Sequence, residues 1–408
     1  MSKINTLFLS YDGMTDALGQ SQVLPYLVGL SKQYNITLIS FEKKENFEKN
    51  KNTIQKIVDD NNITWLPLNY TKKPPVLSTL YDVYRLKKIV YKLIEGKNIK
   101  IIHCRSYITA LIGLSAKQKF GTKFIFDMRG FWADERVDGK LWNIENPIFK
   151  RIYQYFKKKE IQFLQNADYT ISLTQNAKDE ILSWKEFKNN TIPIQVIPCC
   201  VDTNLFDINK ISKENIHNWK NKLGIQENDF VLSYLGSVGT WYMLDEMMQF
   251  FVQLKNILPQ AKFLFINKDE QQRITEAATK LNIQDSIIIQ AGNRNEVPEL
   301  LSLSKLSIFF ILPSYSKKAS SPTKQGELMA MQIPIVCNAG VGDTDFIVKK
   351  YHSGFVIENF MFDDTIQKIT NNNLENIFNL SEIRQGSIAY FSLKKGIDKY
   401  LEAYKYVL

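Results

Sequence analysis

Short runs of β-branched and aromatic residues alternate with longer amphipathic segments along this chain, and this alternation limits the fold more than any other feature. A strand, a crossover helix and a second strand in turn are typical of a parallel sheet with helices on both faces. The chain is therefore predicted to be α/β, with two doubly wound sheets in tandem. In the first half the predicted strands are Ile4–Ser10, Ile36–Phe41, Ile63–Leu68, Ile99–Cys104, Lys123–Asp127, Tyr169–Leu173 and Ile194–Ile197. In the second half they are Phe230–Leu235, Lys262–Ile266, Ser286–Gln290, Leu306–Ile311, Ile333–Cys337 and Gly354–Ile357.

A length of 408 residues suits two domains of ordinary size. A break at Ile197–Asp202, followed by the polar stretch Asn209–Asn218, suits the connection between them. We predict an N-terminal domain over residues 1–198 and a C-terminal domain over residues 199–392, with the final helix, 393–408, packed back on the first domain. Other helical patterns lie at Val23–Lys32, Leu80–Glu95 and Ser381–Ala389, and the pattern of the final helix covers Leu393–Tyr406.

Composition is that of an ordinary globular protein, with 44% hydrophobic and 23% charged residues. The apolar runs fall short of the ~20 residues that span a bilayer, and the first residues resemble a strand more than a signal peptide. The cysteines and histidines lack the spacing of a metal or redox site. These features predict a cytoplasmic protein with buried thiols and no metal cluster. The residues concerned are Cys104, Cys199, Cys200, Cys337, His103, His217 and His352.

The excess of positive charge lies in the first half. Residues 1–200 contain 30 Lys and Arg against 19 Asp and Glu, whereas residues 201–408 contain 22 against 23. This asymmetry indicates an anionic partner, such as a membrane surface, a lipid-linked phosphate or nucleic acid. The basic, aromatic-rich segment Ile148–Lys159 either lies on such a membrane or is a crossover helix with its lysines in water. Its candidate membrane contacts are Lys150, Arg151, Lys157, Lys158 and Lys159.

The stretch Ser320–Ala330 is a loop of small polar residues that runs into a helix start. A helix start offers free backbone N–H groups and the positive end of the dipole, and both favour a phosphate. Lys324 adds a mobile positive charge for the same anion. Glu327, about one turn further on, could accept hydrogen bonds from paired sugar hydroxyls. A capped helix with a surface lysine is the alternative interpretation.

A glycine-rich turn follows the first predicted strand of the second half. Glycines such as Gly236 and Gly239 let the backbone approach a ligand closely, and open N–H groups suit phosphate. Arg294 follows the third strand of that half, where it either reaches the same phosphates or lies on the surface. The chain contains neither G-x-G-x-x-G nor G-x-x-x-x-G-K-[ST], so dinucleotide-binding and P-loop interpretations are excluded.

Polar and aromatic residues also follow three strands of the first half, where ligands of parallel sheets bind. Tyr11–Gln22 is longer than an ordinary βα turn and predicts a flexible loop that closes over a substrate, although an ordinary capped turn is the alternative. Phe126–Arg136 mixes charged and aromatic residues in a way that suits a sugar ring, or else forms a salt-bridged loop packed down by its aromatics. His103 and Arg105 end a neighbouring strand, where a lone histidine can also be a core residue.

With these segments the chain resembles glycosyltransferase family 4, retaining enzymes of the GT-B architecture. The resemblance covers essentially the whole chain and is most specific at Val196–Asp202 with Phe206, and at Ser320–Val336. Tyr11–Gln22 and Asp127–Gly139 are similar to a branch that acts in bacterial surface-polysaccharide synthesis. The resemblance implies two Rossmann-like domains that face each other across a cleft.

On the donor side, the resemblance matches Glu327 to the second glutamate of the family's E-x7-E motif, which binds the nucleotide ribose. The first glutamate falls at Ala319 and is absent, as is the basic pair expected at Gly239–Tyr242. Lys324, with Arg294 in reserve, is the natural replacement for neutralising the diphosphate. The predicted donor-binding residues are Gly236, Ser237, Arg294, Ser321, Thr323, Lys324 and Glu327.

The resemblance further implies transfer of a hexosyl or N-acetylhexosaminyl group from a nucleotide-diphosphate sugar to a glycan or lipid-linked acceptor, by front-face attack without a protein nucleophile. Lys324, Arg129 and Asp134 are expected to act in catalysis. No cofactor or metal is expected. We expect a cytoplasmic protein, peripheral on an anionic membrane, with no nucleic acid partner. The predicted acceptor-side residues are Asp16, Gly19, Gln20, His103, Arg105, Asp127, Arg129, Trp132 and Glu135.

Two alternatives fit the same pattern. A GT-B-fold sugar-nucleotide epimerase would release a free altered sugar, but it needs acidic and histidine groups that the sequence does not place. A non-catalytic nucleotide-sugar-binding protein would suit the absent first glutamate and basic pair. Release of nucleotide from donor plus acceptor would separate an enzyme from a binding protein.

Overall fold

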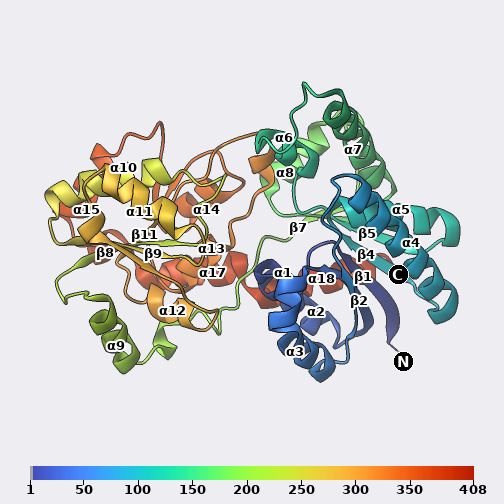
Figure 1. Cartoon of the computed structure of the whole chain (residues 1–408), viewed down its shortest axis with the longest axis horizontal. Coiled ribbons are helices and arrows are strands. Elements are labelled where there is room, and N and C mark those ends of the chain that lie inside the picture. Colours follow the sequence, from blue (N-terminus) through green and yellow to red (C-terminus); the bar gives the residue numbers. More distant parts are fainter. Residues whose placement is uncertain (1–2) are drawn as a thin grey trace. The chain divides into compact units, whose positions relative to one another are not determined.

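The computed structural model describes residues 3–408 and divides the chain into two compact units. Unit 1 contains the residues up to Pro198 together with Leu393–Leu408, and unit 2 contains Cys199–Ser392. Each unit is built on a parallel sheet with helices on both faces (Figure 1). The predicted α/β class with two Rossmann-like sheets is therefore confirmed.

The unit 1 sheet has seven strands in the order β3-β2-β1-β4-β5-β6-β7. Because the chain order reverses between β1 and β4, the carboxyl ends of these strands mark the place where such sheets bind ligands. The strands are β1 (Ile4–Ser10), β2 (Tyr34–Glu42), β3 (Thr64–Asn69), β4 (Ile101–Arg105), β5 (Lys123–Asp127), β6 (Tyr169–Ser172) and β7 (Ile194–Val196). The helices are α1 (Ala17–Gln22), α2 (Leu24–Leu30), α3 (Lys44–Asp60), α4 (Leu77–Lys97), α5 (Ser106–Phe120), α6 (Trp132–Asp138), α7 (Pro147–Asn166), α8 (Gln175–Ser183) and α18 (Leu393–Tyr406).

The last helix, α18, belongs to the core of unit 1. It packs on α2 so closely that a Cβ on Gly29 would lie 2.5 Å from Cδ1 of Ile397. Tyr404 is fully buried, and its hydroxyl lies 2.9 Å from Nδ1 of His103 on β4. The C-terminal residues thus complete the apolar face of a sheet whose strands come from the first half of the chain.

The unit 2 sheet has six strands in the order β10-β9-β8-β11-β12-β13, with its reversal between β8 and β11. Its central strands are buried on both faces, and this explains the apolar run Phe263–Ile266 in β9. The strands are β8 (Phe230–Leu235), β9 (Ala261–Ile266), β10 (Ile287–Gln290), β11 (Leu306–Phe309), β12 (Ile335–Asn338) and β13 (Gly354–Ile357). The helices are η1 (Ile208–Lys210), α9 (Lys213–Leu223), α10 (Leu244–Ile257), α11 (Gln271–Lys280), η2 (Gln284–Ser286), α12 (Glu296–Leu301), η3 (Ser316–Ala319), α13 (Thr323–Ala330), α14 (Thr344–Lys350), α15 (Asp363–Asn371), α16 (Leu374–Ile377) and α17 (Leu380–Phe391).

Candidate active site

The glycine turn of unit 2 follows β8, at the reversal point of the sheet. Gly236 has a φ of +113°, which glycine adopts without strain. The N–H of Gly236 donates to the carbonyl of Ile266 at 3.0 Å. The carbonyl of Gly236 accepts a hydrogen bond from Nδ2 of Asn267 at 2.7 Å. The N–H of Gly236 is therefore already used and is not one of the open donors that the sequence predicted for a phosphate.

Lys324, the second residue of α13, is buried beside that turn. Its Nζ donates to the hydroxyl of Tyr234 at 3.0 Å and lies 3.2 Å from where a Cβ on Gly236 would stand. The rings of Tyr234 and Tyr242 flank the amine, with centroids 4.2 and 3.9 Å from Nζ. Burial lowers the pKa of Lys324 to about 7, although the nearby Glu327 raises it. A bound anion would therefore favour the protonated form.

Glu327 lies one turn after Lys324 and is paired with Arg294. Nη1 of Arg294 donates to the Glu327 carboxylate, and the guanidinium lies 4.7 Å from the centroid of the Phe206 ring. Glu327 is buried at the end of this contact, and Arg294 is partly exposed. Arg294 thus neutralises Glu327, which reduces the charge that it can bring to a diphosphate.

The other predicted donor residues lie at the same carboxyl edge of the sheet. The hydroxyl of Tyr234 donates to the carbonyl of Ser237 directly after Gly236, which fixes that turn. Ser321 accepts a hydrogen bond from the Cys199 N–H at 3.1 Å. Thr323 is the first residue of α13. The structure thus brings the predicted donor-side residues of unit 2 to one edge.

Sequence reasoning missed two residues of this edge, Lys317 and Trp241. Lys317 is buried on η3, and its Nζ lies 3.6 Å from the centroid of the Trp241 ring, which belongs to the glycine-rich segment. It therefore places a cation near the position where the resemblance shows no basic pair. Lys317 lies two residues before Ala319, where the first glutamate of the family motif is expected, and this position could have drawn attention to it.

A charged cluster marks the corresponding edge of unit 1, at the ends of β4 and β5. Nε of Arg105 lies 3.4 Å from Oδ2 of Asp12, just after β1. Nη1 of Arg129, whose φ is +59°, lies 3.7 Å from Oδ1 of Asp127. Tyr400 donates to Oδ2 of Asp127 at 2.9 Å. The ends of β1, β4 and β5 thus hold two guanidiniums and two carboxylates together, at the position expected for a ligand.

Burial and charge act in opposite directions on Asp127. Burial alone would raise the pKa of this carboxyl, but Arg129 and His103 outweigh it and hold the pKa at about 2. Burial lowers the pKa of His103, which is fully enclosed 3.5 Å from Asp127, so its ring is neutral at neutral pH. His103 therefore has the contacts of a core residue, which was one of the two predicted interpretations.

The loop after β1 differs from the predicted flexible segment. Residues Ala17–Gln22 form α1, and the buried carboxylate of Glu42 accepts hydrogen bonds from the N–H groups of Met14 and Thr15 at 2.8 and 3.1 Å. Sequence reasoning missed Glu42 because it lies at the end of another strand. The loop is pinned to β2 through this carboxylate, and Gly19 is close enough that a Cβ would meet the Gly13 carbonyl at 2.2 Å.

Two other predicted acceptor-side residues, Asp16 and Gln20, make hydrogen bonds within the same region. Asp16 accepts hydrogen bonds from Lys43 at 2.8 Å and from Asn46 at 2.5 Å, so it holds α1 to α3 without capping α1. Gln20 is exposed, and its amide donates to the Thr15 carbonyl at 3.1 Å. Acceptor contacts for these two residues stay a prediction.

The predicted residues on α6 are engaged by unit 1 itself. Both Asp134 oxygens accept 2.8 Å hydrogen bonds, from Tyr153 and Lys157. Trp132 stacks on Tyr107 with centroids 5.8 Å apart, and Glu135 is half-buried. These contacts favour the alternative of a salt-bridged, aromatic-packed segment, because catalysis by Asp134 would require it to leave two partners.

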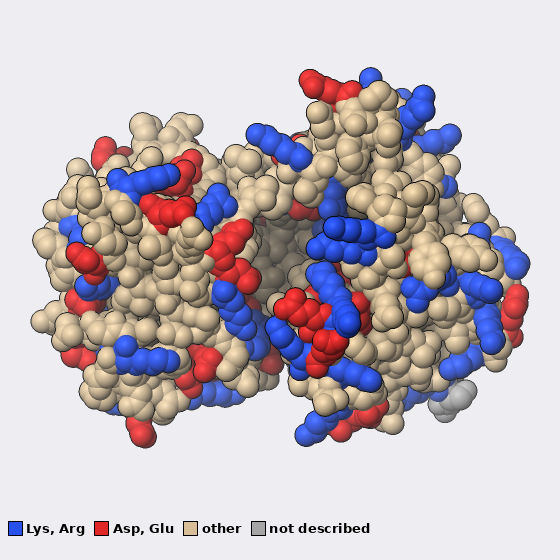
Figure 2. All heavy atoms as spheres, in the orientation of Figure 1, with Lys and Arg blue, Asp and Glu red and all other residues tan. Residues whose placement is uncertain are grey.

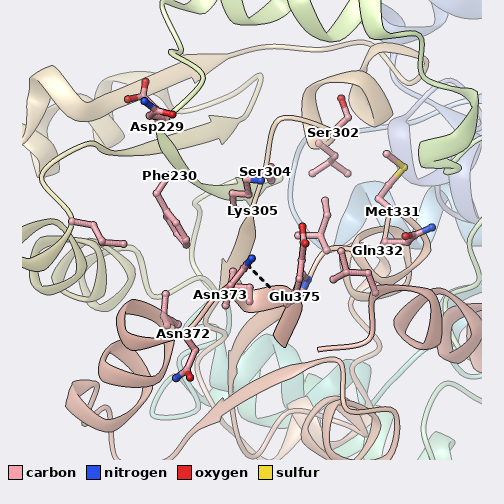
Figure 3. Close-up of a pocket in the computed structure, with 18 of the residues that line it drawn as sticks. Asp229, Phe230, Ser302, Ser304, Lys305, Met331, Gln332, Asn372, Asn373 and Glu375 are labelled. Atoms are coloured by element: carbon pink, nitrogen blue, oxygen red, sulfur yellow. Dashed lines mark hydrogen bonds between the residues drawn. The ribbon is translucent and has the colours of Figure 1, made fainter. Parts of the chain in front are cut away.

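A separate cavity of about 450 Å³ lies at the opposite, amino-terminal edge of the unit 2 sheet (Figure 3). Phe230 and Lys305 line it close to the starts of β8 and β11, together with polar residues such as Asp229, Asn373 and Glu375. The predicted donor residues lie at the carboxyl edge, so this cavity is separate from them. Its mixed lining shows no common charge that would identify a ligand.

Residues 3–408 contain neither a candidate metal site nor a helix that could span a membrane. In that part of the chain, no group of three His, Cys, Asp or Glu is arranged to hold a metal ion. No helix described there is both long and apolar enough to cross a bilayer. All four cysteines are buried thiols.

Comparison with known protein families identifies the family to which this chain belongs. A family model described as Glycosyltransferase Family 4 matches residues 27–205, and one described as Glycosyl transferases group 1 matches residues 215–385. The chain belongs to the GT-B glycosyltransferases of the family 4 type. The matched segments include Arg105 and Asp127 in unit 1, and Gly236 and Lys324 in unit 2.

Solved structures support the same fold for this glycosyltransferase. A glycosyltransferase from Rickettsia africae is 18% identical, with a TM-score of 0.71 over 100% of this chain and 99% of that one. Anabaena HepE in complex with UDP-glucose is 13% identical, with a TM-score of 0.71 over 98% and 99%. WaaG, a glycosyltransferase of lipopolysaccharide biosynthesis, is 13% identical, with a TM-score of 0.67 over 97% and 99%. No protein with a curated description matches the chain.

Proposed function

We propose that this glycosyltransferase moves a hexosyl or N-acetylhexosaminyl group, with retention, from a nucleotide-diphosphate sugar to a glycan or lipid-linked acceptor in bacterial surface-polysaccharide synthesis. The observation that best supports this proposal is the buried Lys324, whose Nζ lies beside Gly236 at the reversal point of the unit 2 sheet. Anabaena HepE binds UDP-glucose and WaaG acts in lipopolysaccharide biosynthesis, and both share this fold. Work at the cytoplasmic face of a membrane, without a metal, is part of the proposal.

The chemistry asked of these residues is electrostatic. As the bond between the anomeric carbon and the phosphate oxygen breaks, negative charge grows on the leaving diphosphate. The Lys324 ammonium and the start of α13 stabilise that charge, because they are fixed before the reaction and shielded from water. The acceptor oxygen bonds to the anomeric carbon on the same face, and its proton passes to the leaving phosphate.

Glu327 tests the donor side of this proposal. We expect Glu327→Ala to weaken donor affinity while turnover at saturating donor changes little, because ribose contacts are made in the ground state and the transition state alike. Titration calorimetry with the nucleotide-sugar and initial rates would separate the two effects. Arg294→Ala is the matched control for the ion pair, because it frees the Glu327 carboxylate. A large fall in turnover with unchanged donor affinity would contradict the ribose role.

The activity itself is tested by nucleotide release. Thermal-shift measurements against a panel of nucleotide-sugars would first identify the donor, and released nucleotide would then be measured with glycan and lipid-linked acceptors. Acceptor-dependent release with retention at the anomeric carbon is the expected result. Donor binding without release under any acceptor would favour a binding protein, and release of a free altered sugar would favour an epimerase.

A further inference from the structure

Helix α4 presents apolar side chains on two opposite sides. At 3.6 residues per turn, its buried residues repeat every four positions and form one face against the sheet. The first two turns place Leu77, Leu80, Tyr81 and Tyr84 on the other side, where they are 63%, 59%, 55% and 63% exposed. We call these four residues the outer face of α4. The buried residues are Ser78, Asp82, Leu86, Val90 and Ile94.

The outer face is unusual because its members are contiguous. Single exposed apolar residues are normal on a protein surface, but a set at i, i+3, i+4 and i+7 forms one stripe that faces water. Val76, 40% exposed, extends the stripe at the start of the helix. Such a stripe is stabilised only when something apolar covers it.

Basic side chains frame this stripe along the chain. Lys72 and Lys73 precede the helix, and Lys87 and Lys88 follow about one turn after Tyr84, all of them exposed. Lys and Arg side chains are spread over the visible face of unit 1 (Figure 2). An apolar helix face framed by cations is the pattern of a helix that lies in the headgroup region of an anionic bilayer.

The outer face lies on a helix that contacts the edge of unit 1 that holds the charged cluster. Helix α4 follows β3, so its first turns lie near the carboxyl ends of the strands. Tyr11, at the end of β1, donates to Oδ2 of Asp82 on α4 at 3.1 Å. The next residue, Asp12, contacts Arg105. A membrane that receives the outer face would therefore bring lipid headgroups close to the charged cluster.

The basic helix α7 is less suited to this contact than its sequence suggests. Lys157, one of its five candidate membrane residues, is held by Asp134 and Glu160 within unit 1, and Lys159 donates to Gln162 at 2.9 Å. Its remaining exposed cations are Lys150, Arg151 and Lys158. The charge of Lys157 is therefore already paired within unit 1, which disfavours its contact with a membrane, and membrane contact by the five residues stays a prediction.

We propose that the outer face of α4 inserts into the headgroup region of an anionic membrane and presents a lipid-linked acceptor to the edge that holds Arg105 and Asp127. The role of presenting an acceptor rests on the proposed function, whereas the membrane contact itself does not require catalysis. The apolar stripe supplies the affinity, and the flanking lysines select anionic lipid.

The test is sedimentation of the full chain with vesicles of phosphatidylglycerol and phosphatidylcholine, or of phosphatidylcholine alone. The triple variant Leu77→Ser, Leu80→Ser, Tyr84→Ser should lower the partition coefficient about 100-fold or more, since each buried side chain is worth roughly tenfold. The matched control is Leu141→Ser, Ile144→Ser, Ile148→Ser, which removes side chains that are 60%, 46% and 63% exposed elsewhere on unit 1. The control should bind as the wild type does.

Salt and charge variants complete the test. High salt screens the lysines but does not weaken the apolar contribution, so part of the vesicle binding should persist. Changing the five basic residues of α7, Lys150, Arg151, Lys157, Lys158 and Lys159, to Gln should leave vesicle binding unchanged. Unchanged binding of the α4 variant, or release by the α7 change alone, would overturn the proposal. So would an α4 variant whose oligomeric state changes without vesicles, because the face would then join two copies. Thermal shift with the nucleotide-sugar panel reports donor binding separately, so failure of the proposed function is distinguishable.

Discussion

Replacing Lys324 with Ala is expected to lower the turnover number by two orders of magnitude or more. Lys324 is the buried cation next to Gly236, and losing one preorganised donor of this kind costs about 10²–10³ in rate. Steady-state rates at saturating donor would measure the loss. Lys318→Ala is the matched control, because Lys318 is exposed on the preceding turn and should tolerate the change. Wild-type turnover in Lys324→Ala would place the diphosphate elsewhere, with Lys317 the first residue to examine.

The same lysine predicts a pH dependence of donor binding. Burial lowers the pKa of free Lys324 to about 7, and a bound diphosphate would raise it again. Below that pH the amine is already charged, so donor affinity should be flat. Above it, binding requires uptake of a proton, and affinity should fall by up to about tenfold per pH unit until the pKa of the complex is reached. Calorimetry in buffers of different ionisation enthalpy measures the number of protons taken up when the donor binds. Proton uptake that persists in Lys324→Ala would contradict its assignment to this lysine.

Lys324→Ala should not unfold the protein. Because the folded pKa lies below the ordinary value of 10.5, the buried charge costs stability at pH 7 and below. Removing it should leave the unfolding temperature unchanged or raised at pH 7. A lower unfolding temperature would mean that its contacts with Tyr234 and Tyr242 outweigh the cost of burial.

Asp127→Ala is expected to lower the free energy of unfolding of unit 1 by about 3–5 kcal/mol, because it leaves the largely enclosed Arg129 guanidinium without its carboxylate partner. Asp127 is enclosed among Arg129, His103 and Tyr400. Hydrogen exchange of the β4 and β5 amides, together with denaturant unfolding, would report the loss. The control is Glu45→Ala, which removes an exposed pair with Lys49 and should cost less than about 0.5 kcal/mol.

The pH dependence of this deficit follows from the direction of the shift. The pKa of Asp127 is about 2 in the folded protein against an ordinary 3.8, so the carboxylate contributes its stability above about pH 4. That contribution is lost as the pH falls from 4 toward 2. The difference between wild type and Asp127→Ala should therefore shrink across this window. An equal deficit at pH 7 and pH 2 would show that packing, and not charge, is lost.

The sheets could be predicted from the sequence because strand formation is read from local pattern. Each predicted strand overlaps an observed one, and Phe230–Leu235 and Lys123–Asp127 coincide with β8 and β5. Leu393–Tyr406 also coincides with α18. Periodicity and turn residues act within a few positions, so they leave a signal in any short window. The loop Tyr11–Gln22 was less readable, because the carboxylate that pins it, Glu42, comes from another strand.

By itself the sequence determined the two Rossmann-like units, the glycine turn at Gly236 and the placing of Lys324 at a helix start. Only the tertiary structure decided what those groups are: a lysine enclosed by Tyr234 and Tyr242, a glutamate paired with Arg294, and an outer face of α4 left uncovered. The reason is physical. A backbone pattern depends on neighbours along the chain, whereas burial, ion pairing and the pKa of a side chain depend on partners brought near by the fold, such as Tyr234 for Lys324, 90 residues away.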